Sequence, residues 1–438
     1  MLIAGMGLFY FSQTHRAISM AEILSKSMLF LGIALAAIIS ITIFTNGVTT
    51  INEQTQGDPV QGIEGLSSGV IYDLTGTDAL DFVGTETIRA SVQDSSGRIF
   101  IAGTNGLFAV YVGGITNITS DLSGTDDGDF IGTSTIEDLA YDPINNRVYL
   151  ITSDTSVKFG YYDVAENAVH DLSSTDDAGF LDTGVSSYSR FIEYSTVDDA
   201  VFIYASSNGG DAGTVAGYYS RLENVTRNYD AVFDGVVVNV NTEDTFMNDV
   251  TIDTSNNAVY IGSSDGDFIQ MNLTTNATQQ LPSEAVSSIG AIAMQGVDVW
   301  ATADGTNYKW TRATDSTASV FTTGIVGEPS RLLIDNNHLY HSDMVSAFIR
   351  VNLDGFATED MYSLDENGFM GANPIRSLTP QGDGDLFITG DTGVFGFYKA
   401  SAASTSGSTI PFIRTILTIT VLLFFVAIFT RMSRTARP

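Results

Sequence analysis

Cysteine is absent from this 438-residue chain. No disulfide, zinc–thiolate site or cysteine nucleophile can therefore form, so an exported domain would depend on its packed core. Basic residues are scarce, with 19 lysines and arginines against 51 aspartates and glutamates. A surface of this charge repels the phosphate backbone, which excludes nucleic acid as a partner. The sequence also lacks a nucleophile elbow, a phosphate-binding glycine loop and a metalloprotease helix. These absences favour a protein that is not an enzyme.

Histidine is rare as well, with four residues in the chain. His15 and His170 stand alone, and His338 and His341 lie together on a predicted strand. A separation of three residues on a strand points two side chains to opposite faces. We therefore expect surface or core histidines rather than a shared metal site.

The negative charge is concentrated in the middle of the chain. Residues 46–408 contain 50 acidic and 13 basic residues, a net charge of −37, while the two ends together carry +5. Only four lysines occur in the whole chain. This composition is similar to that of proteins from salt-loving archaea, whose acidic surfaces stay hydrated at high ionic strength. An ordinary acidic exported protein is the alternative interpretation.

Two apolar runs predict membrane-spanning helices. Residues 27–45 are uncharged and have roughly the ~20-residue length that a bilayer requires, and residues 410–430 form a second run with Arg414 near one end. Lys26 precedes the first run and three arginines follow the second, which places both termini in the cytoplasm by the positive-inside rule. A cleaved signal peptide is the alternative for the first run.

The predicted spans define the remaining segments of the chain. Outside the membrane, linkers at 46–68 and 401–409 flank a folded domain at 69–400. Inside are an N-terminal segment at 1–26 and a basic tail at 431–438. The domain is thus expected to be extracellular, or to occupy the equivalent position on a virion envelope.

An internal repeat of about 50 residues predicts the architecture of this domain. The segment Asp73–Gly84 returns almost unchanged as Asp121–Gly132, and a looser copy covers Asp171–Phe180. Short strands and turns lie between the copies, and seven such units can be counted, so the chain is expected to be all-β, a seven-bladed β-propeller. The units are Ile88–Tyr111, Ile136–Val164, Phe191–Tyr219, Val250–Asn272, Ile289–Thr311, Leu332–Leu353 and Leu378–Ala400.

Two of these units resemble known repeat families. Val92–Leu107 resembles the two-component-regulator propeller repeat of sensor ectodomains, and Tyr141–Thr152 is similar to the YVTN repeat of archaeal surface-layer propellers. The likeness covers one or two strands in each unit and weakens in the fifth and sixth. It implies the propeller fold and an extracellular setting, and it implies no particular ligand.

A spare strand at the start of the domain predicts how the ring closes. Gly69–Leu74 resembles an outermost strand, but no inner strands precede it, and the last unit ends at Gly393–Lys399 without an outermost strand. Pairing the two segments completes the last blade and removes exposed sheet edges. Both linkers then leave one face, which also carries turns such as those at Asp94, Asp142 and Asp253, and the blade-joining loops lie on the other.

The acidic blade-joining loops are the candidate binding site. Clustered carboxylates suit calcium, which takes oxygen ligands. The predicted metal ligands are Asp126, Asp127, Asp129, Asp176 and Asp177, and the predicted partner contacts are Asp78, Asp81, Asp365 and Glu366. The alternative is that these acids hydrate the surface and cap the turns themselves. Four sequons predict glycosylation at Asn117, Asn224, Asn272 and Asn276.

Three functions are compatible with this sequence. The first is a membrane-anchored extracellular propeller that binds a protein or glycan partner, as an adhesin, receptor or surface-complex subunit. The second is a structural spike or lattice component of an archaeal virus envelope or cell surface, in which the propeller forms homo-oligomers. The third is a hydrolase or lyase with a site in the central channel, which buried carboxylates of perturbed pKa on the channel wall would favour.

Overall fold

The computed structural model describes residues 67–400, apart from 79, 114–117, 127–129, 154–157, 176–186, 208–214, 229–246, 254, 264–265, 267, 276, 283–287, 304, 313–315, 323–328, 344–346, 372 and 383. The described residues all belong to one compact unit, which spans 58–438. Within them no helix is long and apolar enough to cross a membrane. The predicted spans at 27–45 and 410–430 lie outside the described residues.

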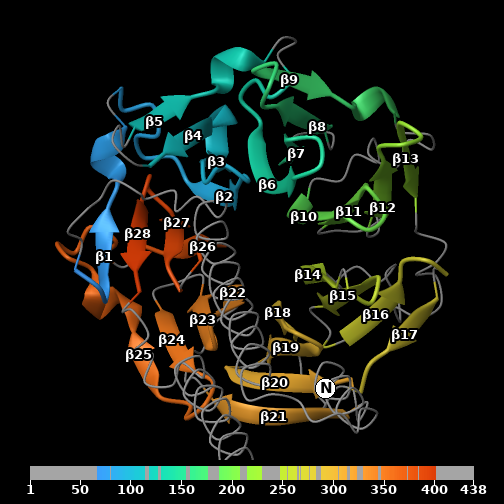
Figure 1. The fold of residues 1–438 in the computed structure, drawn as a ribbon, viewed down its shortest axis with the longest axis vertical. Coiled ribbons are helices and arrows are strands. Elements are labelled where there is room, and N and C mark those ends of the chain that lie inside the picture. Colours follow the sequence, from blue (N-terminus) through green and yellow to red (C-terminus); the bar gives the residue numbers. More distant parts are fainter. Residues whose placement is uncertain are drawn as a thin grey trace, which may run out of the picture. The chain divides into compact units, whose positions relative to one another are not determined.

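The described residues form seven four-stranded antiparallel sheets, which confirms the seven-bladed β-propeller (Figure 1). Blade 1 holds β2 (Ile88–Gln93), β3 (Ile99–Gly103), β4 (Phe108–Val112) and β5 (Ile118–Asp121). Blade 2 holds β6 (Thr135–Asp142), β7 (Arg147–Ser153), β8 (Lys158–Asp163) and β9 (Ala168–Asp171). Blade 3 holds β10 (Ser187–Ser195), β11 (Ala200–Ser207), β12 (Val215–Ser220) and β13 (Val225–Asn228). Blade 4 holds β14 (Met247–Asp253), β15 (Ala258–Ser263), β16 (Phe268–Asn272) and β17 (Thr278–Gln280).

The remaining three blades follow the same order. Blade 5 holds β18 (Ala291–Gln295), β19 (Asp298–Ala303), β20 (Thr306–Thr311) and β21 (Ser316–Thr322). Blade 6 holds β22 (Pro329–Asp335), β23 (His338–Asp343), β24 (Phe348–Asn352) and β25 (Thr358–Asp360). Blade 7 holds β26 (Ile375–Pro380), β27 (Leu386–Gly390), β28 (Phe395–Lys399) and, as its outer strand, β1 (Val70–Asp73). Short 3₁₀ helices are η1 (Thr75–Thr77), η2 (Thr104–Gly106), η3 (Ser123–Thr125), η4 (Ser173–Thr175) and η5 (Met361–Leu364).

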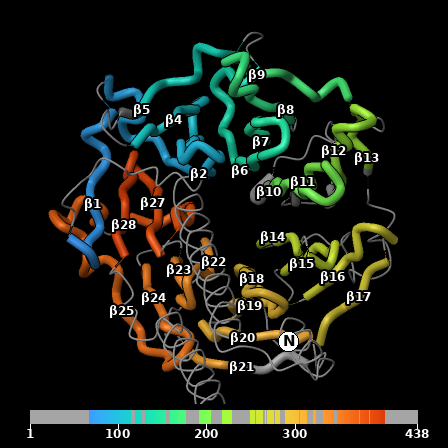
Figure 2. The backbone as a smooth tube through the Cα atoms, in the orientation of Figure 1, coloured from blue at the N-terminus to red at the C-terminus, as the bar shows by residue number. Residues whose placement is uncertain are grey.

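The ring closes through the first strand of the domain, as the sequence predicted. β1 pairs antiparallel with β28, in the register Val70 to Lys399 and Asp73 to Gly396. The first strand of each blade contacts the first strand of the next in an unbroken cycle from β2 through β26 and back to β2. The backbone trace shows these strands nearest the axis (Figure 2).

The two ends of the described chain leave from the same face. Gly69 N–H donates to the Lys399 carbonyl over 2.7 Å, so residues 69 and 399 lie side by side. Asp385, in the turn between the first two strands of blade 7, accepts a hydrogen bond from Ala400 N–H over 2.7 Å. The turns between the first and second strands and between the third and fourth strands of each blade therefore share one face with both chain ends, and we call it the turn face. The loops that join successive blades lie on the opposite face, the loop face.

The core is a set of seven apolar layers, each lying between two successive blades. The second strand of a blade is buried on both sides, as in β3 and β15, where every residue is buried. Its aromatic residue packs against the second strand of the next blade. Tyr149 of blade 2 and Ile203 of blade 3 belong to one such cluster, and Tyr260 of blade 4 and Ala301 of blade 5 belong to another.

Candidate functional site

Three of the acidic residues predicted to bind a partner or a metal ion form hydrogen bonds within their own blade-joining loops. The Asp78 carboxylate accepts hydrogen bonds from Phe82 N–H and Val83 N–H, over 3.3 and 2.8 Å. Asp126 accepts from Phe130 N–H and Ile131 N–H over 3.1 and 2.7 Å. Asp365 accepts from Met370 N–H over 2.8 Å. These contacts agree with the alternative that the aspartates cap their own turns.

Each loop that an aspartate closes in this way also contacts the next blade. Asp126 forms a parallel bridge with Val169 in the outer strand of blade 2, and Asp365 forms one with Ile71 in the outer strand of blade 7. The Phe130 ring lies where a Cβ on Gly160 would come within 2.9 Å of it, and a Cβ on Gly396 would come within 2.5 Å of the Phe369 ring. The repeated phenylalanine therefore fills a space that a glycine in the third strand leaves open.

The other acidic candidates remain predictions. Asp81 and Glu366 are exposed on the loop face, and Glu366 contributes its N–H to the Ile71 carbonyl over 3.2 Å. Asp127, Asp129, Asp176 and Asp177 lie outside the described residues. In the described part of the chain, no group of three acidic or histidine side chains is arranged to hold a metal ion.

Two of the four sequons are described. Asn224 is exposed and its Oδ1 accepts a hydrogen bond from the Tyr219 hydroxyl over 2.8 Å. Asn272 is half-buried and its Oδ1 accepts from Thr274 N–H and Thr275 N–H over 3.0 and 2.9 Å. Both lie on the turn face, and Asn117 and Asn276 lie outside the described residues.

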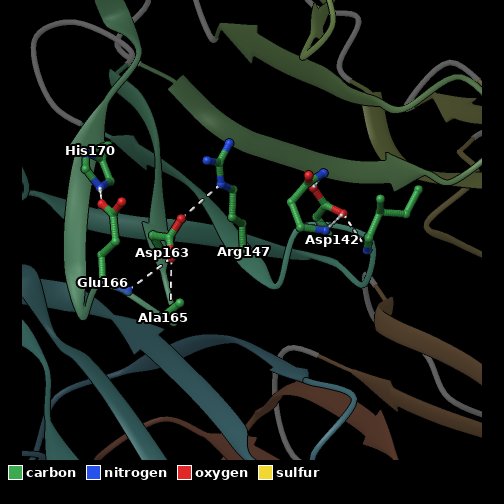
Figure 3. Close-up of polar contacts among 8 residues, drawn as sticks. Asp142, Arg147, Asp163, Ala165, Glu166 and His170 are labelled. Atoms are coloured by element: carbon green, nitrogen blue, oxygen red, sulfur yellow. Dashed lines mark hydrogen bonds and ion pairs between the residues drawn. The ribbon is translucent and has the colours of Figure 1, made fainter.

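The turn face of blades 2 and 3 carries a polar network, part of which Figure 3 shows. Arg147 Nε donates to Asp163 over 3.2 Å, and the same carboxylate accepts from Ala165 N–H and Glu166 N–H (Figure 3). The Arg147 guanidinium also lies 4.2 Å from the centroid of the Tyr161 ring. Asp142 accepts from two backbone N–H groups of its own turn. This network caps turns and orders the hairpins, so we assign it a structural role.

A different group of charged side chains converges on the propeller axis. Asp138 of β6, Asp249 of β14 and Arg331 of β22 occupy equivalent positions, each directly after a bulge in the first strand of its blade. They pair with Ile151, Gly262 and Ser342 in the second strands. Blades 2, 4 and 6 therefore present these side chains at the same height around the axis.

Arg331 reaches across the axis to blade 3. Its guanidinium carbon lies 5.7 Å from the centroid of the Phe191 ring of β10, although blades 3 and 6 are not neighbours in the ring. A cation over an aromatic face is attracted by the ring quadrupole. Phe191 thus provides a platform on which the long side chain of Arg331 rests. We call Asp138, Phe191, Glu193, Asp249 and Arg331 the axial group.

The two aspartates of the axial group also join neighbouring blades. Asp138 accepts from Leu139 N–H of its own strand over 2.9 Å and from Ile192 N–H of blade 3 over 3.0 Å. Asp249 accepts from Val250 N–H over 3.0 Å and from Ile292 N–H of blade 5 over 2.7 Å. Each carboxylate therefore accepts hydrogen bonds from two backbone N–H groups on the inner edge of the ring. No neighbouring strand lies there to supply an acceptor for them.

Burial raises the pKa of all three acids. The pKa of Glu193 rises from 4.5 to about 8, chiefly through burial and then through the charges of Asp249 and Asp138. Burial raises the pKa of Asp138 and of Asp249 to about 6, although the Arg331 charge and the backbone N–H groups act in the opposite direction. The three side chains are partly exposed and yet surrounded by protein, so they face the confined axis rather than bulk solvent.

Comparison with known proteins identifies the fold. No family model and no curated protein matches the sequence. Among solved structures, the chain is similar to an extracellular domain assigned to the hybrid two-component system BT4673 of B. thetaiotaomicron, with a TM-score of 0.56 and 13% identity over 77% of this chain and 43% of that chain. A domain assigned to the hybrid two-component system BT3049 gives a TM-score of 0.50 and 12% identity over 73% and 40%. The chain spans less than half the length of these domains.

Sequence reasoning did not find the axial group, although a signal was present. Asp138, Asp249 and Arg331 each stand four residues before a turn aspartate, namely Asp142, Asp253 and Asp335. When the seven units are aligned on that turn, the same position holds a charged residue in blades 2, 4 and 6. The acids of the loop face were predicted as the binding site instead, because the sequence repeat that contains them is longer and more regular.

Proposed function

We propose that this chain is a membrane-tethered extracellular propeller that acts by binding, and that its ligand contacts the axial group from the loop face. The observation that carries the proposal is the placement of Arg331. A propeller needs only packed strands around its axis, and here one arginine and three acids, all partly exposed, lie close together at the axis. Convergent polar groups of perturbed pKa are typical of binding sites.

The turn face supports the tethered orientation. Both ends of the described chain leave from this face, towards the predicted spans. Five of the described turn tips on this face carry exposed apolar side chains: Ile144, Val197, Leu222, Val297 and Phe356 are 59%, 57%, 84%, 53% and 42% exposed. Apolar tips on the side of the tethers suit a surface that rests against lipid headgroups. The loop face, with Asp81 and Glu366 at its rim, is then left free for a protein or glycan partner.

The binding proposal can be tested with the purified full-length chain. A thermal-shift screen against defined sugars, oligosaccharides, amino acids and divalent cations provides candidate ligands, and each hit is titrated against Arg331→Gln and Arg227→Gln. Arg227 is exposed on the outer strand β13 and serves as the matched control. We expect Arg331→Gln to weaken binding about tenfold or more, as the loss of a charged contact does. Ligands that bind both variants with the same affinity as the wild type would contradict a binding site at the axial group.

A hydrolase or lyase is the second candidate, because one observation favours it. A pKa of about 8 keeps Glu193 protonated at neutral pH, where a carboxylic acid can serve as a proton donor. Asp138 and Asp249 lose their protons at lower pH and supply a base or an electrostatic partner. Turnover of a polysaccharide substrate that Glu193→Gln abolishes would establish this candidate, and binding without turnover would favour the first.

A further inference from the structure

The layer between blades 5 and 6 departs from the plan of the other layers. In five of the seven blades a phenylalanine at an equivalent position of the third strand faces the next blade. These are Phe108, Phe159, Phe268, Phe348 and Phe395. Each belongs to an apolar cluster that also holds an aliphatic residue of the next blade, and those residues are Leu150, Ile203, Ala301, Ile388 and Ile101.

Polar residues take both positions in the layer between blades 5 and 6. Asn307 pairs with Thr302 and so stands where five other blades have phenylalanine. His341 stands in β23 where the second strands of the other blades have an aliphatic residue. Asn307 is 0% exposed and His341 is 1% exposed.

Their neighbours show that these residues face the same layer. Leu339, two residues before His341 and on the same side of β23, belongs to one cluster with Trp300 of blade 5. Thr302 lies two residues beyond Trp300 on the same side of β19, and Asn307 lies beside Thr302 on the adjacent strand. Side chains from both blades therefore meet in one buried space, which we call the polar seam.

Six polar atoms of the polar seam lack a hydrogen-bond partner among the described residues. They are Trp300 Nε1, Thr302 Oγ1, Asn307 Nδ2 and Oδ1, and His341 Nδ1 and Nε2. A buried polar atom without a partner destabilises a fold by roughly 1–3 kcal/mol. Six together would cancel much of the ~5–15 kcal/mol by which a domain is stable. Four side chains of this kind on one layer therefore indicate that a further molecule supplies the missing partners.

The seam restricts the chemistry of that molecule. Trp300 Nε1 can only donate, whereas Asn307, Thr302 and a neutral imidazole together offer both donors and acceptors. Burial lowers the pKa of His341 from 6.5 to about 4, so the ring is uncharged at neutral pH. Leu332, Leu339 and Val351 belong to the packed apolar cluster of the same layer, and because protein interiors are close-packed the further molecule must be small.

We propose that the polar seam is a binding site for internal water, which bridges Trp300, Thr302, Asn307 and His341 across the interface of blades 5 and 6. Water is small, neutral and both a donor and an acceptor, and buried waters typically make about three hydrogen bonds to such groups. The site differs from the axial group in its residues and in its position between two blades, and it does not depend on the proposed function.

The two tryptophans of the chain provide a direct test. In the full-length protein labelled with ¹⁵N-tryptophan, two indole N–H signals are expected, and Trp300→Phe and Trp310→Phe assign them. We expect a rotating-frame Overhauser cross-peak between water and the Trp300 indole proton, with the sign of dipolar contact rather than of exchange. Trp310, which packs between blades 4 and 5, is the internal control. No such cross-peak at Trp300 in the native protein would overturn the proposal.

Variants show whether the polar residues hold the water. The double variant Asn307→Phe with His341→Ile installs the residue types of the other layers, and Thr302→Ala is a milder change because Ala102 occupies the equivalent position in blade 1. We expect the Trp300 cross-peak to be lost in the double variant and weakened in Thr302→Ala, with the Trp310 signal unchanged. A cross-peak of native intensity in both variants would also contradict the proposal, and the native measurement decides if the double variant does not fold.

Discussion

Replacing Glu193 with glutamine should stabilise the propeller at alkaline pH and leave it almost unchanged at pH 5. Glutamine has nearly the same shape, and its oxygen can still accept the backbone hydrogen bond that Ile252 makes with this side chain. What it removes is the charge that Glu193 acquires as the pH rises. That charge forms on the axis, beside Asp249 and Asp138, where burial and two like charges oppose it.

The size and sign of the effect follow from the two pKa values. The pKa of Glu193 is 4.5 in the unfolded chain and about 8 in the folded protein. Between these values the folded protein holds a proton that the unfolded chain has released, so stability is fully present below pH 4.5 and falls as the pH rises towards 8. At ~1.36 kcal/mol for each pH unit, the whole loss is about 5 kcal/mol, and this is an upper limit because the side chain is partly exposed.

The assay is thermal unfolding followed by circular dichroism at pH 5, 6.5 and 8 for wild type, Glu193→Gln and Glu366→Gln. Glu366 is an exposed glutamate on the loop face, so the control changes the same charge in a solvated position. The Glu193 variant should melt only slightly above the wild type at pH 5, where the loss is about 1 kcal/mol or less, and several degrees above it at pH 8. In a domain of this size 1 kcal/mol corresponds to ~2–4 °C or less. Equal pH profiles of wild type and Glu193→Gln would refute the reasoning.

Deleting residues 69–74 should leave β28 with an unpaired edge and remove the buried Ile71, so the domain should aggregate in light-scattering measurements. A monomeric product of native stability would contradict the role of β1 as the closing strand. The melting temperature should rise between 0.01 and 1 M salt, because the Debye length falls from ~30 to ~3 Å and the charge of −37 on residues 46–408 is screened; a melting temperature indifferent to salt would exclude the halophilic interpretation. Gly396→Ala should destabilise the fold by about 1–3 kcal/mol in denaturant titrations, since the new Cβ would lie 2.5 Å from the Phe369 ring and 2.7 Å from the Tyr72 carbonyl. Gly124→Ala, with no atom within 4 Å, is its control and should be neutral.

The architecture could be predicted because it depends on local patterns. Each blade carries its own strand and turn signals, and each sequence unit spans most of the first three strands of one sheet. The closing pair of β1 and β28 followed from counting strands, since one end of the domain had an outer strand to spare and the other lacked one. Neither inference required knowledge of which side chains meet across two blades.

The roles of the aspartates could not be predicted because they depend on those contacts. Asp78 and Asp126 look like surface acids in the sequence, yet each closes a loop whose phenylalanine packs on the next blade. Asp94, Asp142 and Asp253, expected in turns on the opposite face, are 4%, 0% and 3% exposed because they cap their turns from within. A charge change at these turns would therefore test stability rather than binding.

Departures from the repeat are the most informative positions in this chain. Where several blades agree, as in the loop aspartates Asp78, Asp126 and Asp365, a structural need that those blades share is sufficient to explain the residue. Arg331, Asn307 and His341 have no such explanation, since other blades form the same strands with alanine, phenylalanine or isoleucine at the equivalent positions. Each places a polar group where packing alone favours an apolar one. In a ring of similar blades, residues of this kind are the best candidates for a role other than folding. They indicate the axis, and the layer between blades 5 and 6, as the places where a ligand would bind.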